Sequence, residues 1–533
     1  MIRFAAITSL ILLTASVGNF GCGTVRPAAD YLHARSLLAA KTGSEAAYDP
    51  EDEAAAAQRV EQLLRDGLTV DEAVQIALLN NRAFQAHFQE IGVSKADLVQ
   101  STLLTNPSLS LSVRFPEGGG RSNLGFGLAQ EIADLWQIPV RKRLAQEQLE
   151  QTILKVVDAG IDLTSRSRQA YYQLLGLQLS EQVVRENADL LEHLQQVAQR
   201  RFSAGEATIL DVNLLQSNAL DAKMNLVTIH RDLALSRAAF DRLLGISTDT
   251  AGVTLTEVLP TASPNLVDDE ELLAQAMEAR LDLKIAAADL DTAELEIRRQ
   301  HRAFLPNVTV GIDAERPEAR APSSPAPLPP ALGNTDLSGL SASQTINQNL
   351  RTLSRAWQAE AGQNTRDLLL QQMDEARGRQ EEKSQAIDLL LGGSLQLTLP
   401  LWDQNTAQIS KAGYQYLQKQ KNYEELLLAV VQEVRQAAAT ARSAQSLLGL
   451  STSEALPLAE RNVATAERVY QAGEDSILVL LLAQQTLNAQ HEACIARAAD
   501  FAIAQSELER VLGGKRERGA VPPANPEAAV PAE

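Results

Sequence analysis

Four segments of the chain alternate apolar and polar residues. In residues 108–115, Ser or Arg occupies every even position and Leu, Val or Phe every odd one. The same alternation recurs in 124–129, 308–313 and 394–401. Period-two alternation predicts β-strands with one apolar face. The pattern fits a soluble sandwich, and it fits equally a membrane barrel with lipid outside and water inside.

Two long runs with apolar residues at helical spacing follow the paired strands. The first spans 141–201 without a proline. Because ~60 residues at 1.5 Å each extend roughly 90 Å, this run predicts coiled-coil-like packing. The second spans 406–470 and is interrupted by Pro457, where we expect a kink. Each run reverses and returns, which predicts two long helical hairpins that point away from two β-hairpins.

The chain is internally duplicated, and this is its strongest signal. Residues 201–213 recur at 469–481, so that Gly205 matches Gly473 at an offset of 268. An earlier part of the chain recurs at an offset of 199. The second copy therefore holds 268 − 199 = 69 additional residues. They comprise a proline-rich loop and a helical stretch, and they replace a short turn of the first copy.

The number of strands limits how a barrel can close. One chain offers four strands, which cannot close by themselves, and an open edge is not tolerated in hydrocarbon. Two chains would give eight strands and a filled lumen, whereas three would give twelve and leave room for a passage. If the strands lie in a membrane, several chains contribute to one barrel.

The N-terminus has the pattern of a targeting segment. Arg3 precedes an apolar run from Phe4 to Val17, which is too short for a spanning helix and suits a signal peptide. The run leads to Gly21-Cys22, which resembles a lipoprotein processing site and makes Cys22 the candidate lipidated residue. The alternative is an ordinary signal peptide that is cleaved nearby. No other stretch approaches 18 consecutive apolar residues.

Composition and charge exclude several function classes. The net charge of −19 argues against nucleic-acid binding. The second cysteine, Cys494, is interpreted as a small buried side chain, so no disulfide framework is expected. The six histidines have no ligand spacing, and no nucleophile elbow, P-loop or dinucleotide fingerprint occurs. We expect no catalytic site, no metal and no cofactor, and therefore no enzyme.

Several motifs in order resemble the TolC-like outer-membrane efflux protein family. They are the opening Leu68-Thr-Val-Asp-Glu-Ala73, the strand entry Asn106-Pro107-Ser108, the strand exit Leu399-Pro400-Leu401-Trp402, two Ala-Gly turns and the duplication itself. The resemblance implies an α+β membrane protein that is a homotrimer in the outer-membrane lipid. A 12-stranded β-barrel, with four strands per chain, would continue into a long periplasmic α-helical barrel.

This fold implies five parts of the chain. They are a signal peptide (1–21), an N-terminal periplasmic linker (22–67), a first repeat (68–260, with its β-hairpin at 108–132), a second repeat (261–514, with its β-hairpin at 307–315 and 394–402 around the inserted loop 316–393) and a disordered C-terminal tail (515–533).

The resemblance also assigns roles to the hairpin reversals. In the family the tips meet a periplasmic adaptor protein that links the duct to an inner-membrane pump. The corresponding positions are Ala204, Gly205, Thr208, Ala472, Gly473 and Ser476. A glycine that only serves a tight turn is a compatible interpretation.

The pore is expected to be narrowest just past these turns, at Asp211, Leu214, Val479 and Leu482. Alternatively, Val479 and Leu482 face neighbouring helices. Trp136 and Trp402 stand at strand-to-helix junctions, where Trp marks a membrane interface or simply packs.

Two function classes remain after these exclusions. The first is a passive exit duct of an efflux or secretion system. The second is a periplasmic coiled-coil scaffold without a pore. The four alternating strands favour the duct, because a scaffold has no need of them.

Overall fold

A computed structural model gives the fold of the chain, which divides into two units. The structure describes residues 25–65, 67–115, 120–132, 134–205, 207–247, 254–261, 268–303, 307–317, 319–320, 347, 350–351, 369–377, 389–398, 402–472 and 477–515. The strand unit takes Leu103–Ile138 and Arg302–Asn405, and the helical unit takes Met1–Thr102, Pro139–His301 and Thr406–Glu533. The expected signal peptide, Cys22 and nearly all of the C-terminal tail lie outside the described residues.

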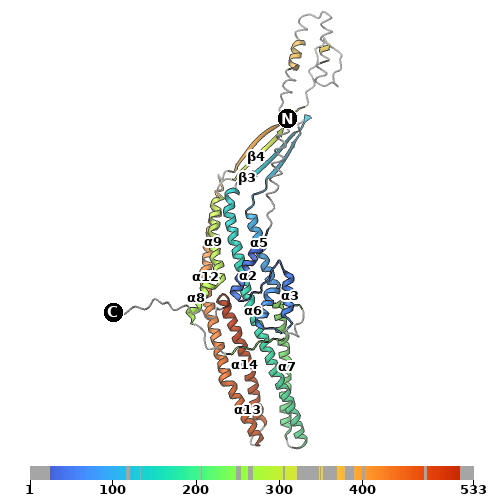
Figure 1. Cartoon of the computed structure of the whole chain (residues 1–533), viewed down its shortest axis with the longest axis vertical. Helices are drawn as coiled ribbons and strands as arrows, with labels where there is room; N and C mark the ends of the chain where they lie inside the picture. The colour runs from blue at the N-terminus through green and yellow to red at the C-terminus, as the bar shows by residue number, and fades with distance from the viewer. Residues whose placement is uncertain are drawn as a thin grey trace, which may run out of the picture. The chain divides into compact units, whose positions relative to one another are not determined.

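The strand unit contains one four-stranded antiparallel sheet. Its strands are β1 (Ser108–Arg114), β3 (Asn123–Glu131), β4 (Asn307–Arg316) and β6 (Leu390–Thr398), in the order β1-β3-β4-β6. All four predicted strands are present. The fourth was predicted from residue 394, but it begins at Leu390, because Leu390 and Leu391 also pair with β4. The two hairpins thus form a single sheet, with β3 and β4 in its middle (Figure 1).

A second small pairing lies beside the sheet and was not predicted. Gly120–Arg121 (β2) pairs with Ala319–Arg320 (β5). These residues belong to the turn of the first β-hairpin and to the start of the inserted loop, so the ends of the two hairpins are joined. The helical stretch of the second copy was expected over 343–391. The structure describes helix at 347, 350–351 and 369–377, but the expected end is wrong, because Leu390 and Leu391 already pair in β6.

The register gathers apolar side chains on one face of the sheet. Leu109 lies opposite Leu128, which lies opposite Ile312. The next row of that face contains Leu111, Phe126 and Leu391. Every one of these side chains is exposed in the single chain, and Leu109 is 78% exposed. An apolar face of this extent indicates a surface that something else covers.

The helical unit contains two long hairpins and four shorter helices that correspond in pairs. In the first copy α4 (Val70–Asn80) and α5 (Arg82–Ser101) precede the hairpin of α6 (Asp134–Ser203) and α7 (Ile209–Leu244). In the second, α8 (Asp269–Ala279) and α9 (Leu281–Arg302) precede α12 (Thr406–Leu450), α13 (Leu456–Gln471) and α14 (Ile477–Val511). Both hairpins reverse at the same end of the unit (Figure 1).

Helix lengths agree with the sequence pattern. The 70 residues of α6 extend roughly 105 Å at the rise of an α-helix. A π-helical turn, Ser451–Ala455, separates α12 from α13 just before Pro457, where the sequence predicted a kink. Among the described residues, no helix combines enough length with enough apolarity to cross a membrane.

Residues 22–67, expected to be a linker, contain two packed helices instead. In the main core of the first copy, α2 (Ala28–Thr42) contributes Tyr31 and Leu38, α3 (Glu53–Leu63) contributes Leu63, and the segment between them contributes Tyr48. Phe88 of α5 lies against both tyrosines, with ring centroids 6.3 Å from Tyr31 and 6.0 Å from Tyr48. The low hydrophobicity of this alanine-rich segment conceals that several of its large apolar side chains are buried, although Leu32 stays exposed.

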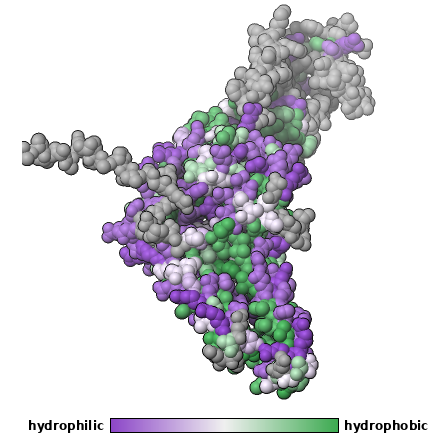
Figure 2. Space-filling view, turned by 60° about the horizontal axis from the view of Figure 1, so that its bottom comes forward, coloured by the Kyte–Doolittle hydropathy of each residue, from purple (hydrophilic) through white to green (hydrophobic). Residues whose placement is uncertain are grey.

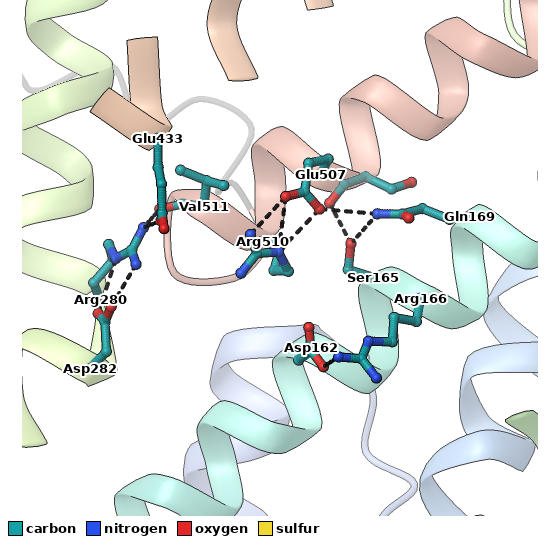
Figure 3. Close-up of polar contacts among 11 residues, drawn as sticks. Asp162, Ser165, Arg166, Gln169, Arg280, Asp282, Glu433, Glu507, Arg510 and Val511 are labelled. Carbon is teal, nitrogen blue, oxygen red and sulfur yellow. Dashed lines mark hydrogen bonds and ion pairs between the residues drawn. The ribbon is translucent and has the colours of Figure 1, made fainter. Parts of the chain in front are cut away.

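The two copies meet through polar contacts as well as apolar ones. Ser165 of α6 donates its hydroxyl to the carbonyl of Ser506 in α14, at 3.0 Å. Gln169 of α6 donates to the Glu507 carboxylate, also at 3.0 Å, and Arg510 pairs with the same carboxylate (Figure 3). These contacts join helices more than 300 residues apart in sequence.

Candidate functional site

The reversal between α6 and α7 is built by a glycine and a capping box. Gly205 has a φ of +80°, a conformation that side chains disfavour, and its N–H donates to Phe202 O at 3.0 Å. Thr208 caps α7: its hydroxyl oxygen accepts from Asp211 N–H, and its own N–H donates to the Asp211 carboxylate at 3.0 Å. Hydrogen bonds from Thr208 lower the pKa of Asp211.

Space around Gly205 is open. Among the described residues no atom lies within 4 Å of the position that a Cβ would take there. The glycine is therefore required by the backbone conformation and not by close packing inside the chain. Its neighbour Ala204 is likewise exposed. This surface is free to receive another molecule.

The reversal between α13 and α14 is described only in part. Ala472 ends α13, and its N–H donates to Arg468 O at 3.0 Å. Gly473 and Ser476 lie outside the described residues. The duplication still places Gly473 at the position of Gly205.

The four expected constriction residues lie in two different environments. Val479 and Leu482 on α14 are 41% and 54% exposed, so the chain itself does not cover them. Leu214 on α7 instead packs against a small core made with Leu191, Leu215 and Leu481. Asp211 is half-buried and held by its capping hydrogen bonds.

Exposed apolar residues at the tip extend beyond those that the sequence singled out. Ile209 and Leu210 begin α7 and are both exposed, as is Leu478 on α14. In Figure 2 apolar side chains lie on the surface of the helical unit down to this end. In the sequence these residues are apolar and follow directly after each turn. Helical periodicity alone would assign such residues to the core of the chain.

Polar side chains link the two hairpins near their tips, and sequence reasoning missed all of these links. Arg201 donates to the Tyr470 hydroxyl at 2.6 Å. Further along, Gln485 donates to Asn218 at 3.3 Å, and Asn488 donates to Asn187. Each pair joins the first copy to the second. No local pattern marks such residues, because each looks like an ordinary solvated helix position.

Trp136 and Trp402, the two tryptophans considered for the membrane interface, differ in exposure. Trp402 is 94% exposed. Trp136 is half-buried, and its indole N–H is enclosed without a hydrogen-bond partner among the described residues. The membrane-interface assignment of Trp402 stays a prediction, whereas Trp136 packs.

Apolar stripes also run along two separate edges of the helical unit. On α7 the exposed residues Leu220, Met224, Val227 and Leu235 share one face. On α12 and α13 an equivalent stripe contains Tyr414, Leu417, Leu428, Leu447, Leu450 and Leu458. Successive members are four, three and eight residues apart on α7, and three, eleven, nineteen, three and eight residues apart on α12 and α13. These intervals keep each stripe on one helical face, as in a coiled-coil seam, and the described residues do not cover either stripe.

No group of three or more His, Cys, Asp or Glu residues within the described ranges is placed to hold a metal ion. A groove of about 1410 Å³ lies between α6, α7 and the start of α5 and is open to solvent.

Comparison with known proteins gives one family and one fold. The model of the family described as outer membrane efflux protein matches residues 73–246 and 375–514, which is more than half of the chain. No curated protein matches it.

Solved structures with the same fold include a membrane protein from Pseudomonas aeruginosa, at 17% identity and a TM-score of 0.62 over 83% of this chain and 93% of that one. The outer membrane protein VceC from Vibrio cholerae matches at 15% and 0.60, over 84% and 96%. The CmeC outer membrane channel from Campylobacter jejuni matches at 15% and 0.61, over 84% and 85%.

Proposed function

The chain belongs to the outer membrane efflux protein family, and we propose that it forms, as a homotrimer, the exit duct of a tripartite efflux or secretion system. The duct conducts its cargo passively from the periplasmic side to the outside. It performs no chemistry of its own. Because a wide shared passage leaves selection to the pump, the cargo is not specified by this chain.

The incomplete sheet is the observation that carries the proposal. Its edges are β1 and β6, and the described strands leave both without a partner. Unpaired strand edges are not tolerated in lipid, so neighbouring chains must complete the sheet. An exposed apolar face of this extent is unfavourable in water, so something apolar must cover it. Three copies would supply twelve strands, enough for a closed barrel around a passage. The apolar face would meet lipid, and the Ser- and Gly-rich face would meet water.

The helical unit supports the same assembly. The apolar stripe on α7 and the stripe on α12 and α13 are different surfaces, so an interface between them is head-to-tail. A head-to-tail interface repeats until the ring closes. A ring of three chains would thereby form a helical barrel, with each α7 against the α12 of its neighbour.

The tips would then carry both the entrance and the docking site. Val479 and Leu482 would form the apolar constriction, with Asp211 as an acidic ring and Leu214 packed behind it. A helical hairpin of the adaptor would approach Ala204, Gly205, Thr208, Ala472, Gly473 and Ser476, and the inner-membrane pump would join through the adaptor. Lipid on Cys22 would anchor the N-terminus in the outer membrane.

The test of the proposal is assembly and conductance. The protein purified in mild detergent should be a trimer by light scattering with the detergent mass subtracted, and it should form channels in planar bilayers. A monodisperse monomer would rule the duct out. A protein that fractionates with the soluble periplasm would indicate the scaffold instead.

The constriction has a test of its own. Replacing Val479 and Leu482 with Ser should raise single-channel conductance, because hydroxyls weaken the exclusion of water from an apolar gate. Leu214→Ser is the matched comparison: its side chain packs inside the chain, so it should lower stability and leave conductance unchanged. Equal conductance of the Val479→Ser/Leu482→Ser variant and the parent would place the narrowest point elsewhere.

A further inference from the structure

Cationic side chains gather in three helix segments that are next to the strands in sequence. They are residues 139–146 of α6, which follows β3, residues 297–302 at the end of α9, which precedes β4, and residues 406–423 of α12, which follows β6. Together these segments carry nine Lys or Arg side chains and no Asp or Glu. The rest of the chain holds the other 39 cations and all 67 carboxylates, a balance of 39 − 67 = −28. The charge of this acidic protein is therefore strongly segregated along its helices.

Some of these cations are held by ion pairs within the chain, and others are not. Arg298 pairs with Glu294 at 2.6 Å, and Lys419 pairs with Asp289 at 2.8 Å. Four cations are exposed and have no carboxylate partner among the described residues; these free cations are Lys142, Arg143, Arg302 and Lys411. Each of the three segments contributes at least one of them. An exposed cation without an ion pair is available to an anionic ligand.

The internal duplication shows that the helices do not need these cations in order to form. Residues 298–302 of α9 correspond, at the offset of 199, to 99–103 at the end of α5, which are uncharged. Residues 141–143 of α6 correspond to 408–410 of α12, also uncharged, at an offset of 267 that relates the ends of β3 and β6 as well. The dipole of a helix favours cations at its C-terminal end, yet α5 ends without any. The fold therefore does not require the cations at these positions.

Chain connectivity keeps the free cations close to the ends of the strands. Arg302 precedes β4 by five residues, and Lys142 follows β3 by eleven, most of them helical. Five extended residues span at most ~17 Å, and nine helical ones span ~14 Å. If the strands cross the outer membrane, these helix ends lie near the lipid headgroups on its periplasmic side. Clusters of Lys and Arg next to a membrane-spanning segment are attracted by anionic headgroups.

We propose that the cationic ends of α6, α9 and α12 bind anionic phospholipid headgroups at the periplasmic surface of the outer membrane, with the four free cations making the contacts. The inference rests on the proposed duct, because only strands that lie in the membrane bring these helix ends to the headgroups. The acidic remainder of the chain is repelled by the same lipids. Attraction at one level and repulsion below it would together fix how deeply the trimer sits in the membrane.

Lipid selectivity of the reconstituted trimer tests the proposal. In phosphatidylcholine bilayers, electron spin resonance of spin-labelled lipids measures the fraction of each lipid that the protein immobilises. The parent should prefer spin-labelled phosphatidylglycerol over spin-labelled phosphatidylcholine about fivefold, as expected from one close contact between a cation and an anionic headgroup. Lipid selectivity that is absent from a parent trimer with normal channels would overturn this inference and leave the duct intact.

Neutralising the free cations should remove the preference and leave the trimer intact. The variant is Lys142→Gln/Arg143→Gln/Arg302→Gln/Lys411→Gln. The matched control neutralises four exposed arginines outside the three segments, and it should keep the preference of the parent; it is Arg59→Gln/Arg200→Gln/Arg461→Gln/Arg468→Gln. Equal preference in the first variant and the parent would contradict the proposed contacts.

Salt provides a test that does not depend on any variant. At ~1 M salt the Debye length falls to ~3 Å, so the preference of the parent for phosphatidylglycerol should fall to about one. A preference that salt leaves unchanged would not be electrostatic and would refute the proposal.

Ion selectivity in planar bilayers of neutral lipid distinguishes lipid contacts from contacts with the cargo. The variant without the free cations should have the same ion selectivity as the parent. A shift toward cations, with the lipid preference retained, would place these side chains in the passage and overturn the proposal. A parent that forms no channels would instead refute the duct, and with it the premise of this inference.

Discussion

In both copies of the repeat the last helix of the long hairpin ends against a short helix of the same copy, but the side chains at the two contacts differ. In the first copy α7 ends at Gly245, which lies against the backbone of Asn80 at the end of α4. In the second, α14 leads to Gly513, which lies against Ala279 at the end of α8. Offsets of 268 and 199 relate these residues pairwise, so the junction is duplicated as a three-dimensional unit.

The side chain after each short helix differs between the copies. Asn81 donates its amide to Leu243 O at 2.9 Å. Its counterpart Arg280 donates to Val511 O at 3.3 Å, and it also pairs with Asp282 and Glu433 (Figure 3). A neutral amide and a charged guanidinium thus serve the same helix end. The comparison teaches that duplication preserves the backbone arrangement and leaves the electrostatics free to diverge.

The largest expected loss of stability comes from substituting Gly245 or Gly513, the two glycines at the ends of α7 and α14. Both have positive φ, +67° for Gly245 and +86° for Gly513, and a Cβ on Gly513 would lie 2.8 Å from the Ala279 carbonyl carbon. Gly245→Ala or Gly513→Ala should each lower the unfolding free energy by about 3 kcal/mol, from backbone strain plus overpacking. Thermal unfolding of the detergent-solubilised protein measures this. Gly205→Ala, with the same φ sign and open space, should cost only about 1 kcal/mol. Equal losses at all three glycines would show that packing at the junctions is unimportant.

The next largest effect on stability distinguishes the charged Arg280 from its neutral counterpart Asn81. Arg280→Met leaves the Asp282 and Glu433 carboxylates without their partner and should cost about 2 kcal/mol. Asn81→Leu removes neutral hydrogen bonds and should cost about 1 kcal/mol. Only the Arg280 variant should lose less stability in high salt, since screening weakens the repulsion that remains. Parallel salt titrations of the two melting temperatures decide this, and identical salt responses would contradict the distinction.

A pH effect is expected where the second junction faces α6. Burial raises the pKa of Asp158 to about 6, with a further contribution from Asp282 and, more weakly, Asp162 against the opposing Arg280 and Arg510. Because this carboxyl group ionises more readily in the unfolded chain than in the folded one, the protein loses stability as pH rises from about 4 to about 6. Asp158→Asn should therefore stabilise the protein by about 2 kcal/mol at pH 7.5 and hardly at all at pH 4. A melting-temperature difference that is constant with pH would show that Asp158 ionises normally.

The smallest effect on stability, with a large one on export, is expected at the tips. The variant is Gly205→Leu with Gly473→Leu, and its Gly205→Leu part should cost about 1 kcal/mol because that backbone is left-handed. It should nevertheless abolish export, because two bulky side chains would occupy the surface that receives the adaptor hairpin. Export in cells and trimer recovery from membranes measure the two outcomes together. Normal export by this variant would remove the docking assignment.

The sequence determined the local elements of this protein. Alternation with period two predicted all four strands, and helical spacing predicted both long hairpins. These features depend on neighbouring residues, so their signals lie within a few positions of one another. The duplication added the equivalence of Gly205 and Gly473.

Only the tertiary structure decided which elements meet. It paired β3 with β4 across almost 180 residues, packed α2 and α3 into the core and turned Leu214 inward. It also brought Arg280 to the end of α14, 231 residues away, and Arg201 to Tyr470. The physical reason is that such contacts depend on the shape and polarity of surfaces assembled from distant segments. A single polar residue on a helix has the same local pattern whether it faces water or another helix.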